Sequence, residues 1–368
     1  MKLHTIQGRA LQIPFHVQFR HASAARDATQ TLWVEARDQH GRVGCGEGCP
    51  REYVTGESLS GALAFVDDVA QPLAREIVNA ESLEAWVAVH RARIDRNPAA
   101  WSAVEMALLD LIGQCEARSV EEVLELPSLR GRFRYSAVIG DGSPERFDAE
   151  LMRYLQAGFQ DFKIKLSGDR ARDAAKVASL RAAGAGVTRV RADANNLWTR
   201  ADEAIEFLAR LDFPFLALEE PLAAGDHAGM ARVAQALGCA IVLDESLLRW
   251  EQLHPLQQWP VRWIANVRIS KMGGVLRSLA LAQSIRDAGM RMVIGAHVGE
   301  TSLLTRAALT LASVSRDILL AQEGAFGSYL LERDVIDPPI MFGAGGVLDA
   351  AQLPVGPGWG GNVWHAPQ

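Results

Sequence analysis

Short apolar runs recur along the middle of the chain, and each of them ends in polar residues. These runs read FKIKL, VRADANN, LALEEP, IVLDES and NVRISK. Their marker residues Lys165, Asp193, Glu219, Asp244 and Lys271 follow one another at intervals of 28, 26, 25 and 27 residues. One strand, one helix and two short loops need about that length, so the pattern predicts a repeated βα unit.

The same pattern extends on both sides of these runs. Segments with apolar residues three or four positions apart, such as GDRARDAAKVASLRAAG and TRADEAIEFLARL, separate the runs and are predicted to be helices. Eight strands are predicted, beginning near residues 134, 162, 190, 216, 241, 266, 292 and 318. This number and spacing predict an α/β fold with a closed (β/α)8 TIM barrel. An open doubly wound sheet is the alternative, but no GxGxxG sequence follows the first strand.

The N-terminal part of the chain has a different pattern. Two β-rich segments, residues 2–13 and 29–38, are predicted to be strands around a loop of turn formers and charges, and residues 41–58 are glycine-rich and predicted to be mostly loop. From Ser58 onward three segments have helical periodicity, so strands are followed by helices, as in an α+β unit. The expected divisions are an α+β domain (1–125), the barrel (126–335) and a Pro- and Gly-rich C-terminal return that packs on the first domain (336–368).

Composition narrows the class of protein. Apolar residues make up 49% of the chain and charged residues 22%, which is typical of a globular enzyme. A net charge of −6 gives no electrostatic footprint for nucleic acid, and no apolar run is long enough for a membrane span or a signal peptide. The four cysteines lack metal-ligand spacing and are expected to be reduced, as in a cytoplasmic protein.

Three of the marker residues are carboxylates on consecutive predicted strands. Asp193, Glu219 and Asp244 would point into one end of the barrel and repel one another without a cation. Because all the donors are oxygen atoms, the expected ion is Mg²⁺. Asn195 and Glu220 are expected to support these ligands. Each carboxylate alone could instead cap the following helix or pair with an arginine, but three in register favour a metal.

The two marker lysines are predicted to lie on opposite sides of the same opening. Lys165 ends strand two and Lys271 ends strand six, which is half of an eight-stranded ring away. Burial and nearby cations, including Lys163, would lower the pKa of such an amine and make it a general base. The alternative is that both lysines merely balance the charge of the three acids. Together these groups predict removal of the proton next to a carboxylate, with Mg²⁺ holding the enediolate that forms.

The ordered motifs resemble those of the enolase superfamily, specifically the muconate-lactonizing-enzyme subgroup of the mandelate racemase/muconate lactonizing enzyme family. They are KIK (163–165), DAN (193–195), EEP (219–221), DES (244–246) and SKMGG (270–274). The resemblance covers nearly the whole chain. It implies an N-terminal domain that caps the barrel mouth, Lys165 and Lys271 as acid/base groups, the three carboxylates as Mg²⁺ ligands, and a homo-oligomer that acts on a small carboxylate.

In this family loops of the capping domain select the substrate. The resemblance therefore makes Phe19, Arg20, His21, Arg26, Arg51 and Tyr53 candidate substrate contacts. His297 ends strand seven, but strand six carries Lys271, so His297 is expected to contact substrate rather than to act as a base. Glu300 is the candidate for the glutamate that the subgroup has near this position.

Strand eight bears on the substrate class. Dipeptide epimerases of the subgroup carry an acidic DxD there, which holds the substrate ammonium group, whereas this chain reads QEGAFGS with Glu323 alone. That difference favours an N-acyl amino acid or a related carbon acid. We therefore expect an isomerase, a racemase or epimerase of such a substrate. The alternatives are a lyase that catalyses syn β-elimination, as o-succinylbenzoate synthase does, a cycloisomerase, or, from another class, a catalytically silent binding barrel.

Overall fold

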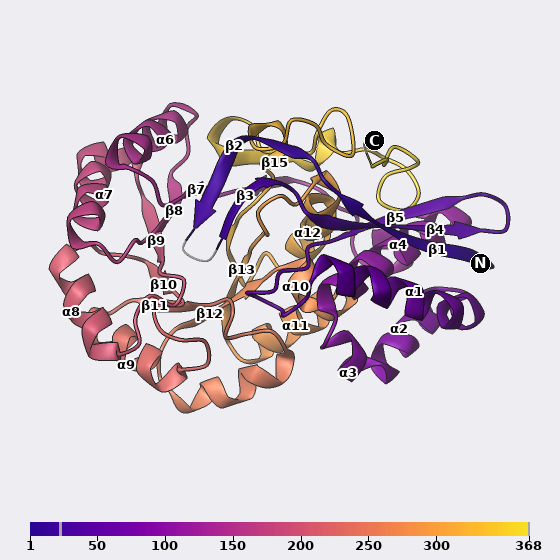
Figure 1. Cartoon of the computed structure of the whole chain (residues 1–368), viewed down its shortest axis with the longest axis horizontal. Coiled ribbons are helices and arrows are strands. Elements are labelled where there is room, and N and C mark those ends of the chain that lie inside the picture. Colours follow the sequence, from indigo (N-terminus) through magenta and orange to yellow (C-terminus); the bar gives the residue numbers. More distant parts are fainter. Residues whose placement is uncertain (22–23, 367–368) are drawn as a thin grey trace.

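The computed structural model describes residues 1–21 and 24–366, with side chains described outside residues 17–26. Figure 1 shows a ring of strands and helices at one side, and the N-terminal sheet and helices at the other. No helix in the described ranges is long and apolar enough to cross a membrane.

Eight parallel strands, hydrogen-bonded in chain order, form the ring. The Ser136 amide donates to the carbonyl of Gln322 (2.8 Å), which joins the first and last strands of the series. Each strand begins within three residues of its predicted start, so the predicted barrel is confirmed. The strands are β7 (Ala137–Ile139), β8 (Asp161–Lys165), β9 (Arg189–Asp193), β10 (Ala217–Glu219), β11 (Ala240–Leu243), β12 (Trp263–Val267), β13 (Arg291–Ile294) and β14 (Leu319–Gln322).

Amphipathic helices cover the outside of the ring. In α8, for example, residues three or four positions apart are buried, whereas the opposite face is charged. One unit departs from the repeat, because a 3₁₀ segment that contains Pro255 (Trp250–Gln258) stands where a helix would connect β11 and β12. The helices are α6 (Pro144–Gln156), α7 (Arg170–Ala183), α8 (Ala201–Leu211), α9 (His227–Leu237), α10 (Ile269–Met272), α11 (Val275–Asp287) and α12 (Ser302–Val314).

An antiparallel sheet of β1 (Leu3–Leu11), β4 (Thr31–Asp38) and β5 (Val43–Gly48) begins the chain. The prediction of loop across 41–58 is wrong for β5. Its alternate glycines, Gly44, Gly46 and Gly48, lie against the backbone of a helix, where a Cβ atom would collide with main-chain carbonyls. The glycines therefore permit close packing in a strand rather than a turn.

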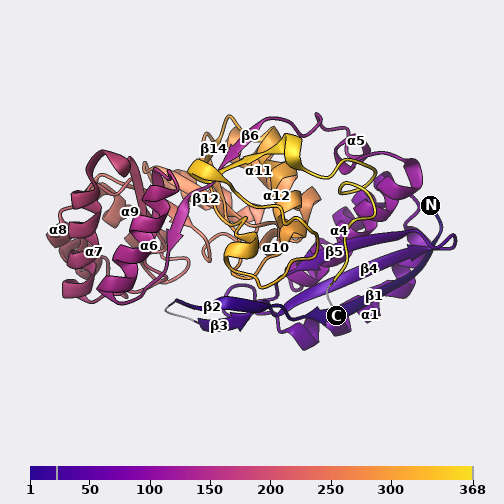
Figure 2. The same cartoon turned by 90° about the horizontal axis from the view of Figure 1, so that it is seen from above.

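The helix that β5 contacts is α4 (Pro98–Glu116), which also packs against α10 and so lies between the N-terminal sheet and the barrel (Figure 2). The other helices here are α1 (Leu59–Glu76), α2 (Ala80–Val89), α3 (Arg91–Ile94) and α5 (Val120–Val123). The C-terminal tail reaches α4 as well, since Trp359 donates its amide to Asp110 and its indole N–H to the carbonyl of Met106. The domain boundaries at 125 and 335 stay predictions.

The stretch predicted as a loop between the first two strands is instead a β-hairpin of β2 (Pro14–His21) and β3 (Ala24–Ala28). It projects from the N-terminal sheet toward the barrel strands (Figure 1). The His16 amide donates to the carbonyl of Leu330 (2.9 Å), and the Glu332 amide donates to the carbonyl of Pro14 (3.0 Å). Main-chain bonds therefore hold the base of the hairpin against the segment that follows β14.

Short elements complete the fold. Strands β6 (Arg132–Arg134) and β15 (Val347–Asp349) pair antiparallel and bring the C-terminal tail beside the entry to the barrel. Further 3₁₀ turns lie at Gly184–Gly186, Gly327–Tyr329, Ala344–Gly346 and Ala350–Gln352.

Candidate active site

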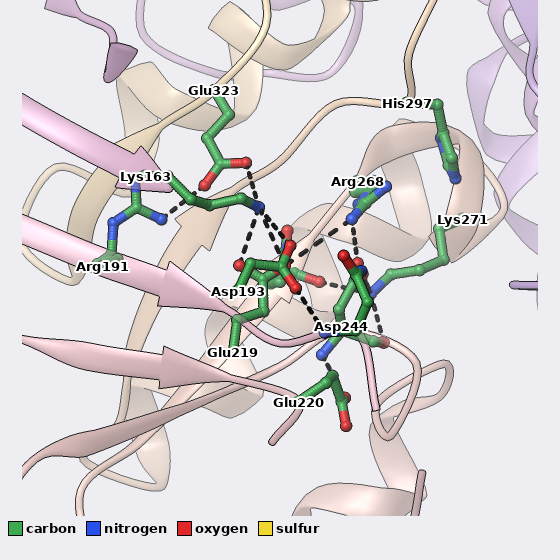
Figure 3. A network of polar contacts seen from close by, with 12 residues as sticks. Lys163, Arg191, Asp193, Glu219, Glu220, Asp244, Arg268, Lys271, His297 and Glu323 are labelled. Carbon is green, nitrogen blue, oxygen red and sulfur yellow. Dashed lines mark hydrogen bonds and ion pairs between the residues drawn. The ribbon is translucent and has the colours of Figure 1, made fainter. Parts of the chain in front are cut away.

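The polar ends of the barrel strands converge at one end of the ring (Figure 3). In β8, Lys163 and Lys165 are two residues apart and therefore share a face, whereas Phe162 and Ile164, which alternate with them, pack into the apolar core. Asp193 and Glu219 are the last residues of β9 and β10. The same alternation thus builds an apolar barrel wall and aims the polar residues into the opening.

The three predicted metal ligands lie together and are almost completely buried. Asp193, Glu219 and Asp244 expose only 1, 1 and 2% of their surface. Lys163 contacts both Glu219 (2.9 Å) and Asp193 (3.3 Å). Arg268 pairs with Asp244 and lies 4.0 Å from Glu219. The carboxylates therefore share cations rather than forming separate pairs.

The two marker lysines contact opposite members of this group. Lys165 Nζ lies 2.5 Å from a carboxylate oxygen of Asp193 and donates to Oδ1 of Asn195 (2.8 Å). Lys271 Nζ donates to Oδ1 of Asp244 (2.8 Å) and to the main-chain carbonyl of Asn266 (2.7 Å). Figure 3 shows Lys271 beside Asp244, with Asp193 and Glu219 on the side of Lys163.

Burial and crowding move the pKa values of these groups in different directions. Burial, followed by the charge of Asp193, raises the pKa of Glu219 to about 7. Burial would also raise the pKa of Asp193, but Lys165 and Lys163 outweigh it and hold that pKa below its ordinary value. Burial lowers the pKa of Lys271 against the opposing charge of Asp244. Burial also opposes ionisation of Asp244, but Arg268 and Lys271 hold its pKa below the ordinary value. Of the three predicted ligands, Glu219 thus ionises reluctantly, whereas Asp193 and Asp244 stay charged.

Glu220 holds the turn that carries Asp244 in place. Its Oε1 accepts the amides of Asp244 and Ser246 (both 2.7 Å), and its Oε2 accepts the Ser246 hydroxyl (2.7 Å). These bonds fix the turn that carries Asp244. Asn266 adds a side-chain bond to Glu219 (3.0 Å).

The donor set fits Mg²⁺ chemically, because it consists of carboxylate oxygens gathered at a buried site. Asp193, Glu219 and Asp244 would hold the ion. Among the described residues, a second set of possible ligands, Cys49, His297 and Glu300, brings its atoms within 4.8 Å of one another. Its thiol and imidazole donors suit softer ions than Mg²⁺.

Sequence reasoning missed several charged residues of the site. Arg268 lies within the NVRISK run but was not considered, although its position two residues after Asn266 places it near the end of β12. Arg191 precedes Asp193 by two positions and shares its face. Strand alternation was the signal that could have found Arg191.

Three of the predicted substrate contacts lie in or next to the wall of one cavity. Tyr53 and His297 line a cavity of about 340 Å³ that also contains Lys163, Lys165 and Arg268. Glu300 lies beside His297, whose amide (2.6 Å) and Nδ1 (3.2 Å) approach its Oε1, and burial raises the pKa of Glu300 to about 7.

The hairpin candidates Phe19, Arg20, His21 and Arg26 have side chains outside the described part of the chain, although the backbones of Phe19 and Arg26 pair across the hairpin. Arg51 is buried, and its guanidinium donates to three main-chain carbonyls (Gln30, Pro50 and Val298). We therefore infer that Arg51 connects the loops that contain these three carbonyl groups.

Glu323 lines the cavity but is held by two cations. Its carboxylate contacts Lys163 (2.8 Å) and Arg191 (2.6 Å) (Figure 3). Although burial acts against it, the charges of these two residues lower the pKa of Glu323 to about 2. A carboxylate neutralised in this way is a poor receptor for a substrate ammonium group.

Comparison with families of known proteins gives a match over residues 146–364 to the family described as enolase C-terminal domain-like. The chain belongs to this family. The match confirms the family resemblance and the barrel fold expected from the motifs.

Related proteins and solved structures are consistent with this family. The chain is 27% identical to a hydrophobic dipeptide epimerase of Enterococcus faecalis, over 89% of this chain and 92% of that protein. It is 23% identical to an N-succinyl-L-Arg/Lys racemase of Bacillus cereus, over 88% and 87%. The structure of a dipeptide epimerase from Methylococcus capsulatus, complexed with Mg and the dipeptide L-Arg-D-Lys, superposes with a TM-score of 0.83 and 28% identity, covering 98% of this chain and 99% of that one. The relatives are isomerases and that complex contains Mg, in agreement with the predicted class and cofactor.

Proposed function

We propose that the protein is a Mg²⁺-dependent racemase or epimerase that moves the proton α to a carboxylate, with an N-acyl amino acid or a related carbon acid as substrate. One observation carries the proposal: Lys165 and Lys271 contact carboxylates at the two ends of the buried Asp193–Glu219–Asp244 group. Racemisation needs one proton acceptor and one proton donor on opposite faces of the α-carbon.

The two lysines serve as proton acceptor and proton donor. One lysine, as the neutral amine, takes the α-proton, and the other, as the ammonium ion, returns a proton to the opposite face. For the other enantiomer the two lysines exchange roles, so that no net proton is gained or lost. When bound, Mg²⁺ would supply positive charge at the substrate carboxylate and stabilise the enediolate.

The contacts around the lysines suit these roles. Lys271 is held by Asp244 and by the carbonyl of Asn266, which fixes the direction of its amine. Asn195 does the same for Lys165. Lys163 remains engaged with Glu219 and Glu323 and maintains the charge balance of the site.

The substrate class follows from strand eight. Among the described residues, Glu323 is the acid at this strand that lines the cavity, and Lys163 and Arg191 already neutralise it. This supports a substrate whose amine is acylated over one with a free ammonium group, in contrast to the dipeptides named for several relatives.

The test is hydrogen exchange. The enzyme is incubated with Mg²⁺ in D₂O and a pool of N-acyl amino acids, dipeptides and hydroxy acids, and the products are analysed by mass spectrometry. Gain of one deuterium without loss of mass supports 1,1-proton transfer. Loss of water would replace the proposal with β-elimination, and tight Mg²⁺-dependent binding without exchange would favour a silent barrel.

We also propose a homo-oligomeric, cytoplasmic enzyme. The support is the family resemblance and the four cysteines, all of which are free thiols. Light scattering of the purified protein tests the first expectation, and fractionation of the source cells tests the second. A monomer or an exported protein would contradict them.

A further inference from the structure

Cys49, His297 and Glu300 form a second group of potential metal ligands, which shares no residue with the three carboxylates expected to hold Mg²⁺. One ligand atom of each residue lies within 4.8 Å of the other two. Cys49 and His297 expose only 0 and 3% of their surface. A thiolate, an imidazole and a carboxylate are the three kinds of donor that Zn²⁺ takes from proteins.

The backbone holds these three residues in place. Cys49 follows β5, and its amide donates to the hydroxyl of Ser270 in α10 (2.7 Å). His297 and Glu300 lie on one turn between β13 and α12: the Glu300 amide donates to the carbonyl of His297 (3.1 Å), and the Glu300 carboxylate accepts the amide of His297 (2.6 Å). Gly299 gives this turn a φ of +90°, which glycine adopts without strain. Main-chain contacts therefore bring donors from the N-terminal sheet and from the barrel together.

Buried negative charge surrounds this group. Glu47 is completely buried and accepts the amide (3.1 Å) and the hydroxyl (2.5 Å) of Thr301, the residue after Glu300. No ion pair joins Glu47 to a cation among the side chains that the structure describes. Burial, together with the charge of Glu300, raises the pKa of Glu47 to about 8. Burial raises the pKa of Glu300 to about 7, although Arg268 and Arg51 act in the opposite direction. A divalent cation bound to Glu300 would lower the cost of charge on both carboxylates.

We propose that Cys49, His297 and Glu300 bind a Zn²⁺ ion that ties the N-terminal sheet to the barrel. Two of the three donors are softer than the carboxylate oxygens that suit Mg²⁺, so this ion differs from the one expected at the three carboxylates. Three protein ligands leave the fourth position of a tetrahedral site to water. Binding displaces the thiol proton of Cys49. The site goes beyond the proposed racemase reaction and does not depend on it.

Cobalt is the probe, because Co²⁺ occupies zinc sites and its absorption spectrum reports its ligands. The protein is stripped with a chelator, supplied with excess Mg²⁺ and titrated with Co²⁺. We expect one bound Co²⁺ per chain, with a sulfur-to-cobalt charge-transfer band in the near ultraviolet. Zn²⁺ added to the stripped protein should raise its unfolding temperature, because the ion binds the folded state. Absence of the charge-transfer band would overturn the proposal.

Two ligand variants test the assignment. Cys49→Ser should abolish the charge-transfer band and cancel the rise in unfolding temperature with Zn²⁺. Glu300→Gln keeps the thiol and should lower the Co²⁺ affinity by at least about 10-fold, the smallest usual effect of losing even an outer-shell partner; it decides the question if Cys49→Ser does not fold.

Cys45→Ser is the matched control, because Cys45 is a second buried thiol in β5 that lies beside the carbonyl of Trp364 (3.9 Å). It should retain the band. A band that survives in Cys49→Ser, or an unchanged affinity in Glu300→Gln, would overturn the proposal.

Asp244→Asn separates the two metal sites. This variant weakens the Mg²⁺ group and should retain the charge-transfer band, whereas loss of the band would overturn a separate zinc site. The racemase is judged by α-proton exchange with Mg²⁺ alone. Exchange without the band in the parent would overturn only the zinc site, and the band without exchange would overturn only the racemase.

Discussion

Two regions of this molecule, the contact between α5 and α12 and the barrel mouth, arrange their buried charges differently. Glu121 of α5 and Arg306 of α12 form a closed pair, with two contacts of 2.8 Å between the guanidinium and both carboxylate oxygens. Thr310 adds a bond to Glu121 (2.6 Å), and the face of Arg306 lies over Trp359 of the tail (5.6 Å). Each charge has a dedicated partner.

At the barrel mouth the charges are shared instead. Lys163 contacts three carboxylates, and Arg268 approaches two. A pair whose two charges are dedicated to each other joins parts of the fold, whereas a network whose members compete can accept a new ion or substrate, because each contact has an alternative.

Removing a mouth lysine should affect catalysis and spare the fold. Lys165→Ala and Lys271→Ala should each lower α-proton exchange by about 10²- to 10⁴-fold, the usual contribution of a positioned acid or base. Circular dichroism and thermal unfolding provide the control and should show a folded protein. Full activity in either variant would exclude the two-lysine mechanism.

Breaking the closed pair should have the opposite effect. Glu121→Gln leaves Arg306 buried without its counter-charge and should lower the free energy of unfolding by about 3–5 kcal/mol. Exchange activity of the folded variant should not change. Urea unfolding measures the loss, with Glu206→Gln, from an exposed pair on α8, as the control that should unfold almost as the parent does.

Asp244→Asn tests the network by weakening the metal site. The substitution keeps the size of the side chain and removes one ligand charge, so we expect Mg²⁺ affinity to fall by more than about 10-fold. Titration calorimetry with Mg²⁺ measures it. An unchanged affinity would remove Asp244 from the ligand set.

The smallest effect is a pH dependence of the closed pair. Burial opposes ionisation of Glu121, but Arg306 outweighs it and lowers the pKa of Glu121 below its ordinary value of 4.5. The stabilisation is therefore present above pH 4.5 and is lost as the pH falls through the lower pKa of the folded protein. The stability difference between the parent and Glu121→Gln should be smaller at pH 4 than at pH 7. A difference that grows on acidification would contradict this assignment.

The sequence predicted the parts of the molecule that depend on local periodicity. Eight strands and the convergence of Asp193, Glu219 and Asp244 follow from repeat length and strand direction. The β5 strand was missed because its glycines are explained by contact with α4, which lies far along the chain.

The anchoring of the β2–β3 hairpin has a consequence for how such enzymes diverge. The hairpin is attached to residues 330–332 through main-chain hydrogen bonds. Every residue type except proline has the backbone N–H group that such bonds need. Side chains beyond that anchor can therefore be exchanged without moving the attachment point. We propose that, in an evolving lineage, this separates a hairpin that selects the substrate from the barrel that transforms it, so that new specificities can be sampled while the reaction is retained.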